Sequence, residues 1–173
     1  MQERDPDYGN VAVNVTMRYL ASVRSEAEGM EHPERLARST RGLVSMGAKI
    51  PSLLVDRARA QEASDRERIG ALFDDFDMLM TPMFTRRPPP IGEWHGLPAP
   101  LMLNGMANFV AYIPIWNHTG QPAAAVPVER APDGFPVAVQ LVGRSDDEAT
   151  LLALSAQLET DMGWLERRPP LAA

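Results

Sequence analysis

The sequence of 173 residues contains no cysteine. This absence excludes disulfide bonds, thiol nucleophiles and thiolate metal ligands. Lysine is nearly absent as well, since Lys49 is the single lysine and the other long basic side chains are arginines. Arginine keeps its proton in proteins, so among these side chains only Lys49 could be tuned into a general base.

The chain also lacks long apolar runs. No stretch is long enough for a membrane span, and residues 1–7 are charged from the third position instead of forming the apolar segment of a secretory signal. We therefore expect a cytoplasmic protein without a membrane partner. The net charge of -6 argues against a nucleic-acid partner, because phosphate binding needs an excess of basic residues on one face.

The motifs of several enzyme classes are missing too. No serine stands in a Gly-x-Ser-x-Gly motif, and there is no glycine-rich phosphate loop. The histidines His32, His95 and His118 are too scattered for a His-x-x-x-His metal pair, so we expect neither a metal site nor a cofactor. Lys49 stands at a helix junction with nothing in its sequence neighbourhood that would orient an amine, and we do not expect it to be catalytic.

The part of the chain that is most informative is residues 117–144. Apolar residues alternate with smaller ones at 126–128 and 137–142, which predicts two strands, and Asp133-Gly134 between them favours the positive φ of a hairpin loop. Both faces of the second strand are largely apolar, as is typical of a central strand covered on two sides. We therefore expect helices beside it.

Periodicity and end signals predict four helices, which we place at Val11–Glu28 (ended by Gly29), at Pro33–Gly47, at Ser52–Asp74, and from an N-cap at Ser145 with Glu148 three residues later to about Gly163. The remaining segments are predicted as a turn at Asp5–Gly9, a short strand at Asp77–Thr81 closed by Pro82, an irregular proline-rich segment at Pro82–Pro100 and a loose tail at Arg167–Ala173.

This order of elements predicts an α/β fold with a few mixed β-strands covered by α-helices. About three strands are few for a sheet that is apolar on both faces, because sheets usually have about four to six strands. The sequence is therefore typical of one part of a larger fold.

Residues 94–128 contain no Asp, Glu, Lys or Arg. Two interpretations of this uncharged segment remain open. Its large side chains are either hydrophobic core, which is the favoured interpretation for each one taken singly, or the apolar wall of a small-molecule pocket. The side chains concerned are those of Trp94, Met102, Met106, Phe109, Tyr112 and Trp116.

Several linked motifs, in this order, resemble the C-terminal portion of the amidase signature family. They are Asp77-x-Leu79-x-Thr81-Pro82, Asn117-x-Thr119-Gly120-Gln121-Pro122-Ala123, Val126-Pro127, Gly134-x-Pro136-Val137-x-Val139-Gln140-Leu141-Val142-Gly143-Arg144, Asp147-Glu148 and Leu151-Leu152. The resemblance runs from about Asp5 to Arg168 and implies hydrolysis of amide C–N bonds.

The same resemblance implies that the catalytic groups lie elsewhere. Members of the family are more than twice this length, and their Ser, cis-Ser and Lys triad lies with a glycine- and serine-rich loop in the N-terminal portion. No stretch here resembles that loop, so no catalytic residue is assigned and the isolated chain is expected to be inactive. The family's Asn-x-Thr-Gly-Gln-Pro loop lies near the substrate funnel, which implies substrate-pocket positions for Tyr112, Trp116, Asn117 and Gln121.

We therefore interpret residues 1–173 as the C-terminal portion of an amidase-type domain. Its expected parts are a loop and helix at 1–31, helices at 32–76, a strand, pocket-side loop and first hairpin strand at 77–128, and the rest of the hairpin with the final helix at 129–168. The expected partner is a small, apolar or neutral amide, once an N-terminal catalytic portion completes the site. Self-association through an exposed sheet edge is a second expectation.

Two alternatives stay open at this point. The chain is either a non-catalytic binding or assembly module of amidase ancestry, or an independent hydrolase with unrecognised chemistry at His95, His118 or Lys49.

Overall fold

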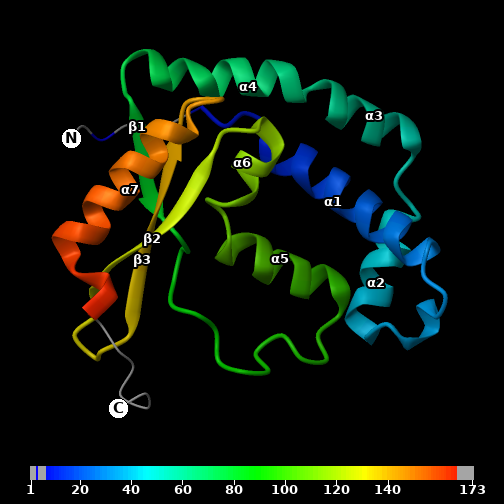
Figure 1. The fold of residues 1–173 in the computed structure, drawn as a ribbon. Coiled ribbons are helices and arrows are strands. Elements are labelled where there is room, and N and C mark those ends of the chain that lie inside the picture. Colours follow the sequence, from blue (N-terminus) through cyan, green and yellow to red (C-terminus); the bar gives the residue numbers. More distant parts are fainter. Residues whose placement is uncertain (1–2, 4–6, 167–173) are drawn as a thin grey trace. The chain divides into compact units, whose positions relative to one another are not determined.

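The computed structural model describes residue 3 and residues 7–166, and the chain divides into two compact units (Figure 1). Unit one comprises Met1–Ile69 with Phe84–Thr119, and unit two comprises Gly70–Met83 with Gly120–Ala173. The predicted tail at Arg167–Ala173 and the Asp5-Pro6 part of the predicted first turn lie outside the described residues.

Unit one is helical. Its elements are α1 (Val11–Glu28), the 3-10 turn η1 (Pro33–Arg35), α2 (Arg38–Gly47), α3 (Ser52–Ala60), α4 (Glu62–Gly70), α5 (Ala99–Phe109) and α6 (Pro114–Thr119). The last residue of α4, Gly70, is assigned to unit two. The helix α1, blue in Figure 1, packs against α2, α3 and α6. Buried side chains of Leu20, Leu43 and Met102 form the core between α1, α2 and α5.

The structure confirms the predicted first helix and its end at Gly29, but not the second helix as one piece. Leu36 and Ala37 have extended backbones, with ψ of 144° and 150°, and they separate η1 from α2. The guanidinium of Arg41 donates hydrogen bonds to the carbonyls of Glu34 and Leu36. These bonds satisfy carbonyls that a continuous helix would have paired internally.

The predicted helix at Ser52–Asp74 is also wrong as one piece. It is interrupted at Gln61, and after α4 the chain continues as the 3-10 helix η2 (Ala71–Asp74). Glu62 and Asp65 lie in the first turn of α4, where negative charge interacts favourably with the helix dipole. The acidic residues therefore favour a new helix start at this point.

Unit two contains a small antiparallel sheet. Its strands are β1 (Met78–Pro82), β2 (Ala123–Arg130) and β3 (Pro136–Gly143), in the order β1-β3-β2, followed by α7 (Glu148–Met162) and the 3-10 turn η3 (Trp164–Glu166). The prediction that the second hairpin strand is central is confirmed. Gly134, with φ of 83°, lies in the hairpin loop as predicted, and β1 begins one residue later than predicted.

One face of this sheet is covered by α7, where Val126, Leu141 and Leu151 form a buried cluster (Figure 1). The predicted N-cap at Ser145 is wrong. Asp147 caps α7 instead, and its Oδ1 accepts hydrogen bonds from the backbone N–H of Thr150 at 3.3 Å and from its hydroxyl at 2.8 Å. An aspartate next to the first helical residue is as good a cap as serine, so the sequence did not separate the two positions.

The irregular segment after Pro82 is confirmed as far as Pro98, but the uncharged residues beyond it form α5 and α6, which the sequence analysis did not predict. Apolar residues occur all round this segment, so no helical stripe stands out against a polar face. Within the described part of the chain, no helix has both the length and the apolar character that a membrane span requires.

The close packing of α1 on α2 depends on Gly47. A Cβ atom at this position would lie 2.3 Å from the backbone oxygen of Leu20, which is closer than real Cβ contacts. We expect Gly47→Ala to lower the free energy of unfolding by about 1–3 kcal/mol, because the two helices would have to move apart. The measurement is urea unfolding followed by circular dichroism.

Gly29→Ala is the matched control. Gly29 has φ of -87°, and the nearest atom to its added Cβ would be 3.6 Å away. This variant should be as stable as the unchanged protein or slightly more stable, since alanine restricts the unfolded chain. Equal stability of the two variants would contradict the close-packing explanation.

Candidate functional site

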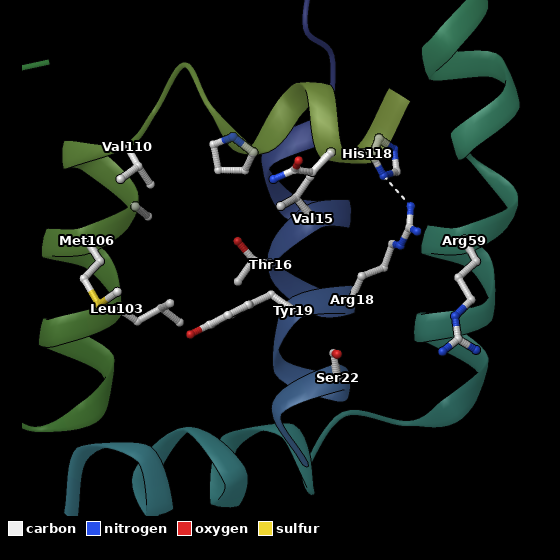
Figure 2. A pocket seen from close by; sticks show the side chains of 13 residues that line it. Val15, Thr16, Arg18, Tyr19, Ser22, Arg59, Leu103, Met106, Val110 and His118 are labelled. Atoms are coloured by element: carbon white, nitrogen blue, oxygen red, sulfur yellow. Dashed lines mark hydrogen bonds between the residues drawn. The ribbon is translucent and has the colours of Figure 1, made fainter. Parts of the chain in front are cut away.

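A pocket with a volume of about 550 Å³ lies within unit one, between α1, α3, α5 and α6. Figure 2 shows Tyr19 reaching from α1 towards Leu103 on α5, and Arg18 reaching from α1 towards His118 on α6. The complete lining consists of Val15, Thr16, Arg18, Tyr19, Ser22, Arg59, Leu103, Met106, Ala107, Val110, Pro114, Asn117 and His118.

Helical spacing explains the two long walls of this pocket. Leu103 and Met106 on α5, with Val110 directly after its last residue, recur at intervals of three and four residues and form one apolar stripe. On α1, Val15 and Ser22 are seven residues apart and share a face with Tyr19 between them. One wall is therefore apolar and the opposite wall carries hydroxyl groups and a cation.

A buried polar cluster lies next to the pocket. The Oδ2 atom of Asp65 accepts hydrogen bonds from Nε2 of His118 at 2.8 Å and from Nδ2 of Asn14 at 3.1 Å, while its Oδ1 accepts one from Arg68. The side chains of Asp65 and His118 are 2% and 1% exposed. The cluster joins α1, α4 and α6.

The hydrogen bonds of this cluster indicate the donor and acceptor roles of the two ring nitrogens of His118. Nη1 of Arg18 lies 2.8 Å from Nδ1 of His118, and arginine has only donors, so Nδ1 accepts and carries no proton. Nε2 faces the carboxylate of Asp65, which accepts, so Nε2 carries the proton. Both ring nitrogens of His118 are therefore engaged by partners within the cluster.

The carboxyl of Asp65 is held ionised by its neighbours. Burial alone would raise its pKa, but the hydrogen bonds from His118, Arg68 and Asn14, together with the charge of Arg68, outweigh burial and lower the pKa below the ordinary value of 3.8. The native state thus keeps this group ionised at pH values at which the unfolded chain binds a proton.

A second set of ion pairs holds the end of α6. Glu62 accepts hydrogen bonds at 3.0 Å from Arg18 and at 3.0 Å from Arg66. Nε of Arg66 in turn donates to the backbone oxygen of Thr119, the last residue of α6. A cation at a helix C-terminus interacts favourably with the helix dipole, so this contact positions the short helix that carries Asn117 and His118.

The four substrate-pocket residues expected from the sequence have different places. Asn117 lines the pocket, Tyr112 is half-buried in the turn before α6, and Trp116 is buried within α6. Gln121 lies in unit two, where it is 5% exposed. Within the described residues, the side-chain nitrogens of Trp116 and Gln121 and the amide oxygen of Gln121 have no hydrogen-bond partner.

The sequence analysis missed Asp65, Asn14 and Arg18. A signal was present, because Asp65 stands four residues before Ile69, which is buried on the same face of α4. A charged residue on a buried stripe indicates a paired charge.

Lys49 and His95 are exposed, and the described residues contain no group of three or more His, Asp or Glu side chains that could hold a metal ion.

A family model described as Amidase matches residues 10–152, which is most of the sequence. The chain belongs to the amidase family. This amidase chain is 39% identical over 170 residues to "Putative amidase AmiB2" of Mycobacterium tuberculosis, a match that covers 98% of the chain and 37% of that relative. The chain thus spans little more than a third of the length of this relative.

Two further matches agree with this assignment. The amidase chain is 36% identical over 104 residues to the 6-aminohexanoate-cyclic-dimer hydrolase of Pseudomonas sp. (strain NK87), covering 56% of the chain and 21% of that enzyme. A solved structure of a 6-aminohexanoate cyclic dimer hydrolase complexed with substrate matches with a TM-score of 0.83 at 21% identity, covering 99% of the chain and 39% of the other. The fold is therefore part of the amidase fold, as the motifs implied.

Replacing Asp65 tests the buried cluster. We expect Asp65→Asn to lower the free energy of unfolding by about 3–5 kcal/mol at neutral pH, since Arg68 loses the anion that compensates it and the amide nitrogen faces other donors. In the unchanged protein, the contribution of Asp65 should be fully present above about pH 5 and lost as the pH falls through 3.8 and below. Urea unfolding between pH 3 and pH 7 measures both effects.

Asp56→Asn is the matched control, because Asp56 is 66% exposed and pairs with Arg59 at 3.5 Å on the surface. Its effect should stay within about 1 kcal/mol. An acid limb of the stability curve that is as steep in Asp65→Asn as in the unchanged protein would contradict the role given to Asp65.

Proposed function

We propose that this chain is the C-terminal portion of an amidase-type hydrolase, in which it supplies part of the substrate-pocket wall. The observation that carries the proposal is the family match over residues 10–152, joined to a pocket that has one apolar wall. In this proposal residues 1–128 provide the helices and the pocket-side loop, and residues 129–168 complete the hairpin and the final helix. The protein acts in the cytoplasm.

The catalytic serines and lysine of the proposed enzyme come from a part of the protein outside this sequence. Two observations support this part of the proposal. Both nitrogens of His118 are engaged by Arg18 and Asp65, and Lys49 is exposed after α2. The length covered in AmiB2, 37%, leaves ample sequence for a catalytic portion.

The proposed substrates are small amides with apolar, uncharged acyl groups. The stripe of Leu103, Met106 and Val110 offers such a group an aliphatic surface, and Asn117 at the rim offers one donor and one acceptor to an amide. Buried polar atoms are nearly always hydrogen-bonded. The unpartnered atoms of Trp116 and Gln121 therefore support a role for both residues in contacting a substrate or the catalytic portion.

A second candidate function is a non-catalytic assembly module. It is favoured by the sheet of unit two, in which β1 and β2 each pair only with β3 among the described strands and leave their outer edges open. Met80 on β1 and Val137 on β3 are 51% and 41% exposed. Open edges and exposed apolar side chains promote association, so this alternative predicts a dimer formed by the chain itself.

The proposed function is tested by a chimera in which this chain replaces the matching 37% of AmiB2. We expect the chimera to hydrolyse hexanamide and to be labelled by a fluorophosphonate serine-hydrolase probe, because it unites the pocket wall with catalytic groups. The chain alone should show neither reaction. Ammonia release and gel fluorescence are the two measurements, with unaltered AmiB2 as the positive control.

Each outcome separates the candidates. Labelling of the isolated chain would refute the claim that its catalytic groups lie elsewhere. A folded but inactive chimera, alongside active AmiB2 and a dimeric isolated chain in light scattering, would favour the assembly module.

Within the active chimera, Asn117→Ala tests the pocket wall. Loss of one hydrogen bond to the amide should raise KM for hexanamide by about threefold to tenfold. Asn104→Ala is the control, since Asn104 is exposed on α5 and does not line the pocket. Steady-state kinetics that respond equally to both substitutions would show that Asn117 does not contact the substrate.

A further inference from the structure

The charged side chains that line the pocket are of one sign. Arg18 enters from α1 and Arg59 from α3, whereas no Asp or Glu belongs to the lining (Figure 2). Nδ1 of His118, which also lines the pocket, faces Arg18 at 2.8 Å and is already engaged. Both arginines lie outside the uncharged segment 94–128, so the pocket has a charge preference that this segment does not reveal.

Arg18 is held in place through one of its three side-chain nitrogens. Its Nη1 donates to Glu62 at 3.0 Å and to His118 at 2.8 Å. Its Nη2 and Nε donate to no acceptor in the described part of the chain, and the side chain is 30% exposed. A guanidinium presents its donors in a rigid fork that matches a carboxylate, so one edge of this fork remains available to a ligand.

Arg59 adds a second positive charge at the pocket. Its side chain is 63% exposed, and its described ion pair is the 3.5 Å contact with Asp56 one turn earlier on α3. Such a surface pair contributes little free energy, so Arg59 can turn towards a ligand without losing a strong contact.

The opposite wall is the apolar stripe of Leu103 and Met106 on α5 and of Val110 directly after it. The pocket volume of about 550 Å³ falls in the range of about 300–1,000 Å³ that is usual for small-molecule sites. A ligand that matches both walls has an unbranched aliphatic body and one anionic end.

We propose that this pocket binds a medium-length aliphatic carboxylate, with the alkyl chain along α5 and the carboxylate at the free edge of Arg18, near Arg59. Hydrolysis of an aliphatic amide leaves such an acid, so the ligand class includes the acyl product of the proposed enzyme. The binding proposal does not rest on turnover, and it is tested without it.

Isothermal titration calorimetry on the full chain compares octanoate, octanamide and octylammonium, which share one chain length and differ in charge. We expect octanoate to bind about tenfold more tightly than octanamide, since charge-assisted hydrogen bonds are stronger than neutral ones, and octylammonium not to bind. Raising the salt concentration should weaken the binding of octanoate and leave the binding of octanamide unchanged. Failure of octanoate to bind at millimolar concentration, or equal affinity for octanoate and octanamide, would overturn the proposal.

Two arginines on the same helix give a matched pair of variants. Arg59 lines the pocket and Arg57 does not, and both are exposed. We expect Arg59→Gln to weaken the binding of octanoate by about two- to fivefold without changing the affinity for octanamide. Arg57→Gln should change neither affinity. An equal effect of the two substitutions would show that octanoate responds to the net charge of the protein and not to the pocket, which also overturns the proposal.

These results and those of the chimera are independent. If the chain binds octanoate while the chimera stays inactive, the proposed carboxylate site is supported and the proposed hydrolase function is refuted. If the chimera is active while the isolated chain binds no carboxylate, the proposed hydrolase function is supported and the carboxylate site is refuted.

Discussion

Asp65 carries a carboxylate that is almost fully buried, and the helices of unit one are arranged so that this charge is paired. Three side chains donate to it, from α1 (Asn14), from α6 (His118) and from its own helix (Arg68). A buried carboxylate without such partners would cost several kcal/mol. The demand for donors therefore ties α1 and α6 to α4, and the contacts of Arg18 with Glu62 and His118 add to this link.

The geometry of the pocket depends on the pairing of Asp65 with His118. Nε2 of His118 donates to Asp65 and Nδ1 accepts from Arg18. The guanidinium of Arg18 is therefore held between His118 and Glu62. Asn117 precedes His118 on the same short helix, and its position at the pocket follows from that of its neighbour. A six-residue helix is too short to be stable alone, so these tertiary contacts decide where it lies.

The elements that the sequence predicted well are those whose signals are local. The first helix, the hairpin with its central second strand and the end of α7 at Gly163 follow from apolar spacing and from glycines with positive φ. The breaks at Leu36-Ala37 and at Gln61 could not be predicted in this way, because Arg41 and the acidic first turn of α4 stabilise them. The helices α5 and α6 were missed because a segment that is apolar all round has no contrast between its faces.

The amino-acid sequence by itself determined the family, through ordered motifs that survive as local patterns, and it also excluded thiol chemistry. Only the tertiary structure decided the site. Asp65 and His118 are 53 positions apart and Arg18 and His118 are 100 apart. No local pattern carries information about such pairs, since their meeting depends on how separate helices pack. Of the four expected pocket residues, Asn117 lines the pocket of unit one, because the helix face it occupies was set by the burial of His118 beside it.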